Sequence, residues 1–304
     1  MKEKILVLAK TYPNLSQKYV ETVCCAGINE KNEWRRLYPI PFRQLPFDQR
    51  FKKFNWIEAD IEKNNKEKLK RKESHKINVE SIKIVGEIDT GKKKDWAERN
   101  KILLPLVSKS LEELEKKKKE HLSLGIIKPK EISEFVLTPL SECRDWEKEL
   151  IEGTQKTLFG EYKTPLDKIP WKFSYIFKCK DENCKGHNIM CEDWELLQSW
   201  RAWKQKYPDE ETVKQKIREK YFNYLKQRNL HFIVGTESRY NKYLIIGLYY
   251  PPKYAPTKQE LDEMLEEFKP WENASIEALK KTDDYISKLK NPSSSKNAQV
   301  TLTT

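Results

Sequence analysis

The second half of the chain is organised by one stretch, Trp171-Lys-Phe-Ser-Tyr-Ile-Phe-Lys-Cys179-Lys-Asp-Glu-Asn-Cys184-Lys-Gly-His187-Asn-Ile-Met-Cys191. Its first part alternates strictly and places Trp171, Phe173, Tyr175 and Phe177 on one side. Period two with one bulky face predicts a half-buried strand, and core packing is the favoured role of these rings. A base-stacking platform is the alternative.

The strand leads directly into a cluster of soft-metal ligands with the spacing C-x4-C-x2-H-x3-C. Thiolates and imidazoles bind zinc tetrahedrally, and four protein ligands close a site to water. Such a closed site is structural, because the bound ion contributes folding free energy. We therefore predict a structural zinc ion held by four residues: Cys179, Cys184, His187 and Cys191.

Cys191 is the least certain member of this ligand set, because it can instead begin the following helix and point into the core. Three ligands would then leave a position for water, which is a catalytic geometry. In that alternative Glu192 or Asp193 is the proton carrier. A simpler role for Asp193 is to cap the helix that follows it.

Charge is the second strong signal in the sequence. The 304 residues carry a net charge of +12, and residues 61–130 hold twenty Lys and Arg against twelve Asp and Glu. A basic protein favours a polyanionic partner, of which nucleic acid, DNA or RNA, is the commonest. The alternative is that interspersed glutamates leave these faces merely solvated.

The compartment follows from cysteine usage and hydropathy. The longest apolar runs are far shorter than a membrane span, and the N-terminus resembles an opening strand more than a signal peptide. Six cysteines without an export signal indicate reduced thiols or metal ligands. We therefore expect a cytoplasmic protein without a membrane partner.

The first ninety residues alternate as short strands around turns and predict a small, curved β-barrel or sheet. Its hairpin combines arginines with aromatic residues, as surfaces that bind single strands or flipped bases do. The alternative is that these aromatic side chains pack inside. The candidate nucleic-acid-binding residues are Lys10, Tyr12, Lys18, Tyr19, Arg35, Arg36 and Arg43.

The whole chain predicts an α+β fold in which a barrel-like N-terminal module precedes a zinc-stabilised α+β module. Helices are expected over 43–54, 96–122 (interrupted at Pro105), 145–157, 192–206, 209–228 and, in the tail, from 257 onwards. The predicted parts are a basic β-rich module (1–95), a helical connector with a strand (96–165), the zinc-loop module (166–256) and a partly disordered helical tail (257–304).

Motifs for common enzyme classes are missing from the sequence: it has no Walker loop, Rossmann glycine fingerprint, H-E-x-x-H or G-x-S-x-G. Besides the three-ligand zinc site, a second enzyme interpretation is a nuclease-like site that combines Lys10 with Glu21, Glu58 and Asp60. Its spacing is not diagnostic, because acidic residues on strands usually face water.

Several motifs resemble those of a poorly characterised prokaryotic protein family over residues 4–252: K-T-Y-P from Lys10, W-R-R-L-Y-P-I-P-F-R from Trp34, F-x-C-x4-C-x-G-H from Phe177 and G-L-Y-Y-P-P from Gly247. The resemblance implies no established activity. Relatives often carry a histidine near 237–240, where this chain has Ser238 and Arg239. The N-terminal part also resembles nucleic-acid-binding barrels of the PUA type, which is an analogy of fold.

We therefore predict a nucleic-acid-binding protein with a structural zinc site, which binds through its basic aromatic N-terminal surface. One alternative is a nuclease or other nucleic-acid-modifying enzyme, with a role in antiviral (phage) defence. Another is a protein-interaction subunit of a larger assembly.

Overall fold

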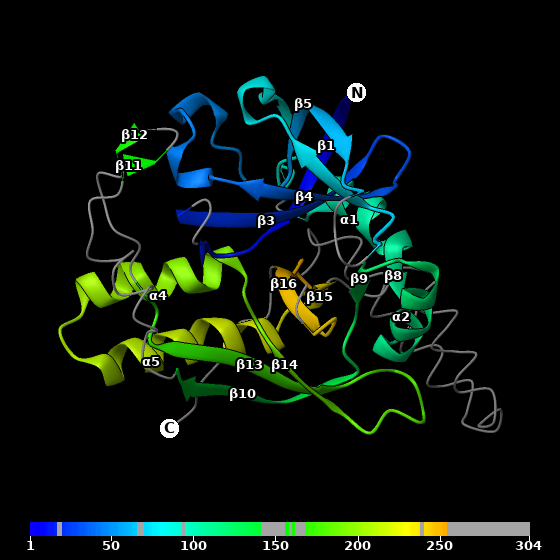
Figure 1. Ribbon diagram of the computed structural model, residues 1–304. Helices are drawn as coiled ribbons and strands as arrows, with labels where there is room; N and C mark the ends of the chain where they lie inside the picture. The colour runs from blue at the N-terminus through cyan, green and yellow to red at the C-terminus, as the bar shows by residue number, and fades with distance from the viewer. Residues whose placement is uncertain are drawn as a thin grey trace, which may run out of the picture. The chain divides into compact units, whose positions relative to one another are not determined.

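The computed structural model describes residues 1–16, 20–65, 70–92, 95–140, 156–157, 160–161, 168–237 and 240–253 (Figure 1). The described residues, all within 1–253, form one compact unit. The helices predicted in the tail lie outside the described residues. So does most of the helix predicted over 145–157, whose last two residues instead form strand β11 (Lys156–Thr157), paired with β12 (Gly160–Glu161).

Five N-terminal strands form a closed barrel: β1 (Lys2–Lys10), β3 (Val20–Asn29), β4 (Trp34–Ile40), β5 (Asn55–Lys63) and β6 (Ser74–Ile77). Closure follows from the pairing, because β1 is antiparallel to both β3 and β5. The circle continues through β4 and a parallel pair with β6, which returns to β5. Two strands lie outside it: β2 (Asn14–Ser16) on β3 and β7 (Lys83–Glu87) on β5. The predicted barrel is confirmed.

The first strand is buried on both faces, which explains its continuous apolar run. Ile5 and Val7 belong to the cluster that fills the barrel. Leu6 and Leu8 point the other way and pack with Ile126 and other residues of a four-stranded sheet described below. Alternation along β1 thus joins the barrel to the rest of the unit.

Two further sheets follow the barrel. The four-stranded sheet has the order β16 (Tyr243–Tyr249), β15 (His231–Thr236), β9 (Leu124–Ile127) and β8 (Val107–Ser108). The three-stranded antiparallel sheet has the order β10 (Glu131–Pro139), β13 (Trp171–Lys178) and β14 (His187–Met190). With the barrel and the helices, these sheets make the α+β fold that the sequence predicts.

The described helices are short: α1 (Ala97–Leu103), α2 (Leu111–Lys117), α4 (Trp194–Lys206) and α5 (Glu210–Arg218), which continues as a π-helical segment (Glu219–Tyr224). The helix predicted over 96–122 is interrupted at Pro105 as expected, but the break is longer than predicted, because a 3-10 turn (Leu104–Leu106) leads into β8 before α2 begins. The helix predicted over 43–54 is two 3-10 turns (Phe42–Gln44 and Phe47–Gln49). Another 3-10 turn (Val79–Ser81) separates β6 from β7. Every helix of the described residues is too short or too polar to cross a lipid bilayer.

The aromatic stripe of β13 forms the core of the second part, as predicted. Phe173, Tyr175 and Phe177 are buried. Their rings contact Trp200 of α4 and Phe232 of β15. The base-stacking alternative therefore does not hold for these three rings.

Candidate metal centre

A group of four potential ligands lies where α2 meets the loop between β13 and β14. Cys179 directly follows β13, Cys184 lies in the loop, and His187 begins β14. The fourth member, Glu112, comes from the first turn of α2. The donor atoms of all four residues lie within 4.8 Å of one another.

Local hydrogen bonds orient the donor atoms of this metal group. The N–H of Leu111 donates to Sγ of Cys179 at 3.3 Å, and the N–H of Cys179 donates to Sγ of Cys184 at 3.2 Å. Nε2 of His187 lies 3.2 Å from Sγ of Cys184 and 3.1 Å from Oε1 of Glu112. Gly186 has a φ of +94°, a backbone conformation that suits glycine at the turn before His187.

The donor set fits a metal ion. The other carboxylate oxygen of Glu112, Oε2, is buried without a hydrogen-bond partner in the described part of the chain. Burial raises the pKa of the Cys179 thiol to about 12, so a nearby cation is needed to keep this sulfur ionised at neutral pH. Ligands at 2.0–2.3 Å from a tetrahedral ion lie roughly 3.3–3.8 Å apart, close to the observed grouping. These four residues could therefore bind a metal ion.

Cys191 does not belong to this group, which corrects the predicted ligand set. It follows the four-residue strand β14, and four extended residues carry it roughly 13 Å beyond His187. Its side chain is buried in the hydrophobic core, and its backbone forms a bridge with Ile245. Burial raises the pKa of this thiol well above its ordinary value. Cys191 is thus a core residue, the alternative that the sequence left open.

Three of the hairpin residues predicted to bind nucleic acid are buried. Lys10 lies with Nζ 3.4 Å from the ring centroid of Phe42 and 4.3 Å from that of Trp194. Burial lowers its pKa to about 8. Tyr12 packs against Trp194, and Arg36 donates to the backbone and hydroxyl oxygens of Ser123. These three side chains cannot form the predicted contact surface.

Two other hairpin residues are held by carboxylates. Arg35 donates to both carboxylate oxygens of Glu3, at 2.6 and 2.7 Å, and to Glu33 at 2.8 Å. Arg43 donates to Glu21 at 3.0 Å. Their charges are largely offset within the protein. Lys18 and Tyr19, the remaining two predicted residues, lie outside the described residues.

The nuclease-like set predicted from the sequence is dispersed. Glu58 pairs with Lys2 at 2.7 Å, whereas Glu21 is buried beside Arg43. Asp60 is exposed on β5, and Lys10 lies in its aromatic surroundings. These residues do not gather into one site.

Asp193 has the capping role that its position suggested and a partner that the sequence did not suggest. Its Oδ1 accepts the N–H groups of Glu195 and Leu196 at the start of α4. Its Oδ2 accepts from Nζ of Lys53 at 2.5 Å, and both side chains are buried. Neither Asp193 nor Glu192 is among the metal group. Both residues follow Cys191 beyond the end of β14, and Asp193 is held by Lys53 and by the first turn of α4.

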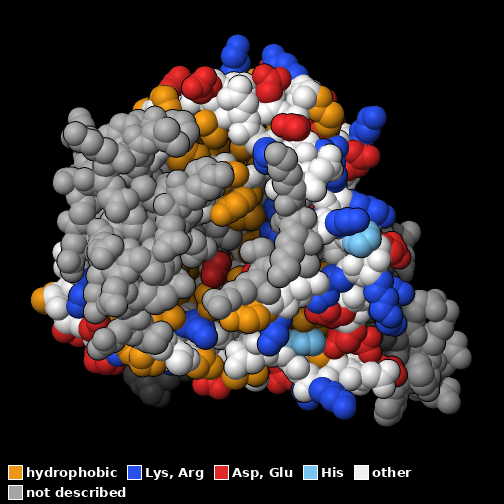
Figure 2. Space-filling model, viewed as in Figure 1, with side chains coloured by type: hydrophobic (Ala, Val, Ile, Leu, Met, Phe, Trp, Pro, Cys, Tyr) orange, Lys and Arg blue, Asp and Glu red, His pale blue; other side chains and the backbone are white. Residues whose placement is uncertain are grey.

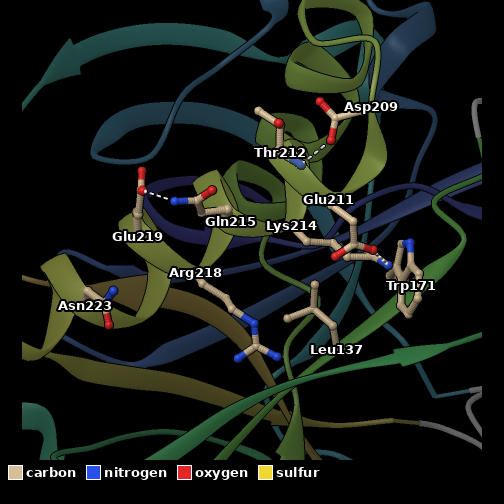
Figure 3. A pocket seen from close by; sticks show the side chains of 10 residues that line it. All are labelled: Leu137, Trp171, Asp209, Glu211, Thr212, Lys214, Gln215, Arg218, Glu219 and Asn223. Carbon is tan, nitrogen blue, oxygen red and sulfur yellow. Dashed lines mark hydrogen bonds and ion pairs between the residues drawn. The ribbon is translucent and has the colours of Figure 1, made fainter.

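A pocket of about 680 Å³ lies elsewhere, between α5 and the strands β10 and β13 (Figure 3). Trp171 lines it, with Nζ of Lys214 4.0 Å from its ring centroid, and Arg218 reaches from α5 towards Leu137. The lining includes the cations Lys214 and Arg218 and three carboxylates, those of Asp209, Glu211 and Glu219. Because these charges offset one another, the pocket does not favour a polyanion.

Two family models match the chain. One, described as a domain of unknown function (DUF8758), matches residues 1–105 and covers the barrel and α1. The other, described as a domain of unknown function (DUF8757), matches residues 107–269 and covers the metal group together with both later sheets. A search of curated proteins gives no match.

Proposed function

The chain belongs to the DUF8757 family, whose description names no activity, and from its own residues we propose that it is a nucleic-acid-binding protein with a structural zinc ion. One observation carries the binding function. Within the basic stretch 61–130, eleven described lysines are exposed, against seven exposed Asp and Glu. The excess positive charge of this stretch thus faces outwards, where it can replace counterions on a phosphate backbone.

Zinc is the metal that this donor set favours. Thiolates and an imidazole suit zinc, and a carboxylate is an accepted fourth ligand. Four protein ligands close the coordination shell, so a structural role is proposed. The ion would stabilise the fold by tying α2 to the loop between β13 and β14.

Other expectations from the sequence accompany this proposal. The closed barrel supports the fold analogy with PUA-type nucleic-acid-binding proteins. We place the protein in the cytoplasm, where reducing conditions keep thiols available to a metal. A protein partner remains the competing explanation for the basic surface.

The binding function is tested with the purified full chain and labelled oligonucleotides about 20 nucleotides long. The probes are single-stranded and double-stranded, and each is made as DNA and as RNA. For at least one of them, we expect the logarithm of the association constant to fall linearly with the logarithm of salt concentration between about 50 and 200 mM. Binding that is absent, or that ignores salt, would contradict the proposal. Incubation of the same strands with divalent metal ions distinguishes a binder, which leaves them intact, from a nuclease.

A further inference from the structure

Three loops that are far apart in the sequence meet at one place on the surface. They connect β5 to β6, α2 to β9, and β15 to β16. The N–H of Lys72 donates to the carbonyl of His121 at 2.9 Å. Nη2 of Arg71 donates to the carbonyl of Glu237 at 2.8 Å, and Nζ of Lys118 donates to that of Asn241 at 3.0 Å. Each loop therefore contacts the other two.

These loops and the end of α2 present cations that form no ion pair with any described residue. Five exposed lysines make no ion pair in the described part of the chain: Lys70, Lys72, Lys116, Lys119 and Lys242. His121 is exposed beside them. Among the described residues of the same segments, the exposed carboxylates are those of Glu115, which pairs with Lys118, and Glu120. Figure 2 shows Lys and Arg side chains gathered over α2.

A buried polar network lies beneath the three loops, whose exposed lysines we call the three-loop surface. One carboxylate oxygen of Glu73 accepts both the N–H and the hydroxyl of Ser123, at 2.5 and 2.6 Å. Ser123 in turn accepts from Arg36 of the barrel at 2.9 Å. These bonds link the loop between β5 and β6, through Ser123 just before β9, to the barrel strand β4.

The metal group also holds α2, the helix that leads to this surface, at its first turn. Leu111 and Glu112 begin α2 and contact Cys179 and His187, whereas Lys116 lies near the helix end and Lys119 just beyond it. One short helix thus spans from the metal group to the lysines. A rigid support of this kind lowers the entropy lost when these side chains meet a ligand.

We infer that the three-loop surface is where the phosphate backbone of a nucleic acid binds. This inference rests on the proposed function and locates it. Unpaired lysines from three segments suit a run of phosphates, which need positive charge and no particular base. This proposed surface differs from the hairpin surface expected from the sequence, whose residues Lys10, Tyr12 and Arg36 are buried.

The test reverses one charge on each loop in the triple variant Lys72→Glu/Lys119→Glu/Lys242→Glu. Its matched control is Lys83→Glu/Lys130→Glu/Lys172→Glu, which changes three exposed lysines elsewhere and alters the net charge equally. Because all six side chains are exposed, we expect both variants to keep the wild-type thermal unfolding midpoint.

For the oligonucleotide that wild type binds best, we expect the loop variant to lose at least about tenfold in affinity at roughly 100 mM salt. The slope of the logarithm of the association constant against the logarithm of salt concentration should also become shallower by about 2 to 3. Each phosphate contact with a duplex contributes about 0.9 to the magnitude of this slope. The control variant should stay within about threefold of wild type.

Two results would overturn the inference, and they are distinguishable. Wild-type binding that both triple variants reduce equally would show that affinity follows total charge, which leaves the proposed function standing. Failure of wild type to bind any strand would overturn the function and the surface together.

Discussion

Lys53 and Asp193 form a buried ion pair between residues that lie 140 positions apart in the sequence, with Nζ 2.5 Å from Oδ2. Lys53 lies just before β5 of the barrel, whereas Asp193 caps α4. The same Oδ2 also accepts the N–H of Leu248 in β16 at 2.9 Å. One carboxylate therefore joins the barrel, the helix α4 and the four-stranded sheet.

Removal of the lysine should destabilise the protein strongly. Burial lowers the pKa of Lys53, but the carboxylates of Asp193 and Glu195 raise it by more, so the net shift is upward and the amine stays charged. Lys53→Met leaves Asp193 buried without its cation, which we expect to cost about 3–5 kcal/mol. Denaturant unfolding of the purified variant measures this loss.

The matched control for Lys53→Met is Lys101→Met, because Lys101 and Glu98 form an exposed pair at 2.6 Å. Exposed pairs contribute little, so we expect a change within about 0.5 kcal/mol. Equal losses of unfolding free energy in the two variants would show that the buried pair stabilises the protein no more than the exposed pair does.

The pH dependence of stability should contain a contribution from Glu192. Burial raises the pKa of Glu192 from 4.5 to about 7, so the folded state favours its protonated form. Between these two values the folded protein binds more protons than the unfolded chain, and stability falls as pH rises. This contribution is at most about 3 kcal/mol.

Glu192→Gln cannot titrate, so comparison with wild type isolates the effect of this carboxyl group. We expect the unfolding free energy of wild type to fall relative to the variant as the pH is raised from 4.5 to 7. Parallel pH profiles for the two proteins would contradict this assignment.

The packing of α2 against β9 depends on a glycine. A Cβ at Gly125 would lie 2.6 Å from Cδ2 of Leu114, which is itself buried. Gly125→Ala should therefore cost about 1–3 kcal/mol through overpacking. Gly86→Ala is the control, because its Cβ would meet its nearest neighbours at 3.9 Å. Thermal unfolding should separate the two, and a larger loss for Gly86→Ala would refute the packing argument.

Arg36 should affect folding and not nucleic-acid contact. Its guanidinium is buried on Ser123, so Arg36→Met removes charged hydrogen bonds and should cost about 3 kcal/mol. Because Arg36 supports the three-loop surface without contacting nucleic acid, the folded variant should lose less affinity than Lys72→Glu/Lys119→Glu/Lys242→Glu. A larger loss from folded Arg36→Met than from that triple variant would favour the hairpin surface expected from the sequence.

Local patterns predicted the strands and caps well. Alternation predicted β13, the apolar N-terminus indicated the opening strand β1, and the position of Asp193 indicated the cap of α4. Each of these features depends on neighbours within a few residues. Periodicity and capping chemistry are therefore visible in a single sequence.

Features that depend on distant segments were not predictable in the same way. Glu112 lies 67 positions before Cys179 and is one of several glutamates in a charged helix, so nothing marks it as a ligand. Lys10 and Arg36 belong to a basic hairpin in sequence, yet the second part of the unit covers them. Tertiary packing decided the role of each of these residues.

Metal content is the measurement that tests the account most directly, because the account assigns the metal group to Glu112, Cys179, Cys184 and His187 and leaves Cys191 in the core. We predict about one zinc per purified wild-type chain, a large loss in Cys184→Ser, and unchanged zinc in folded Cys191→Ser. Zinc that persists in Cys184→Ser but disappears from folded Cys191→Ser would contradict the assignment.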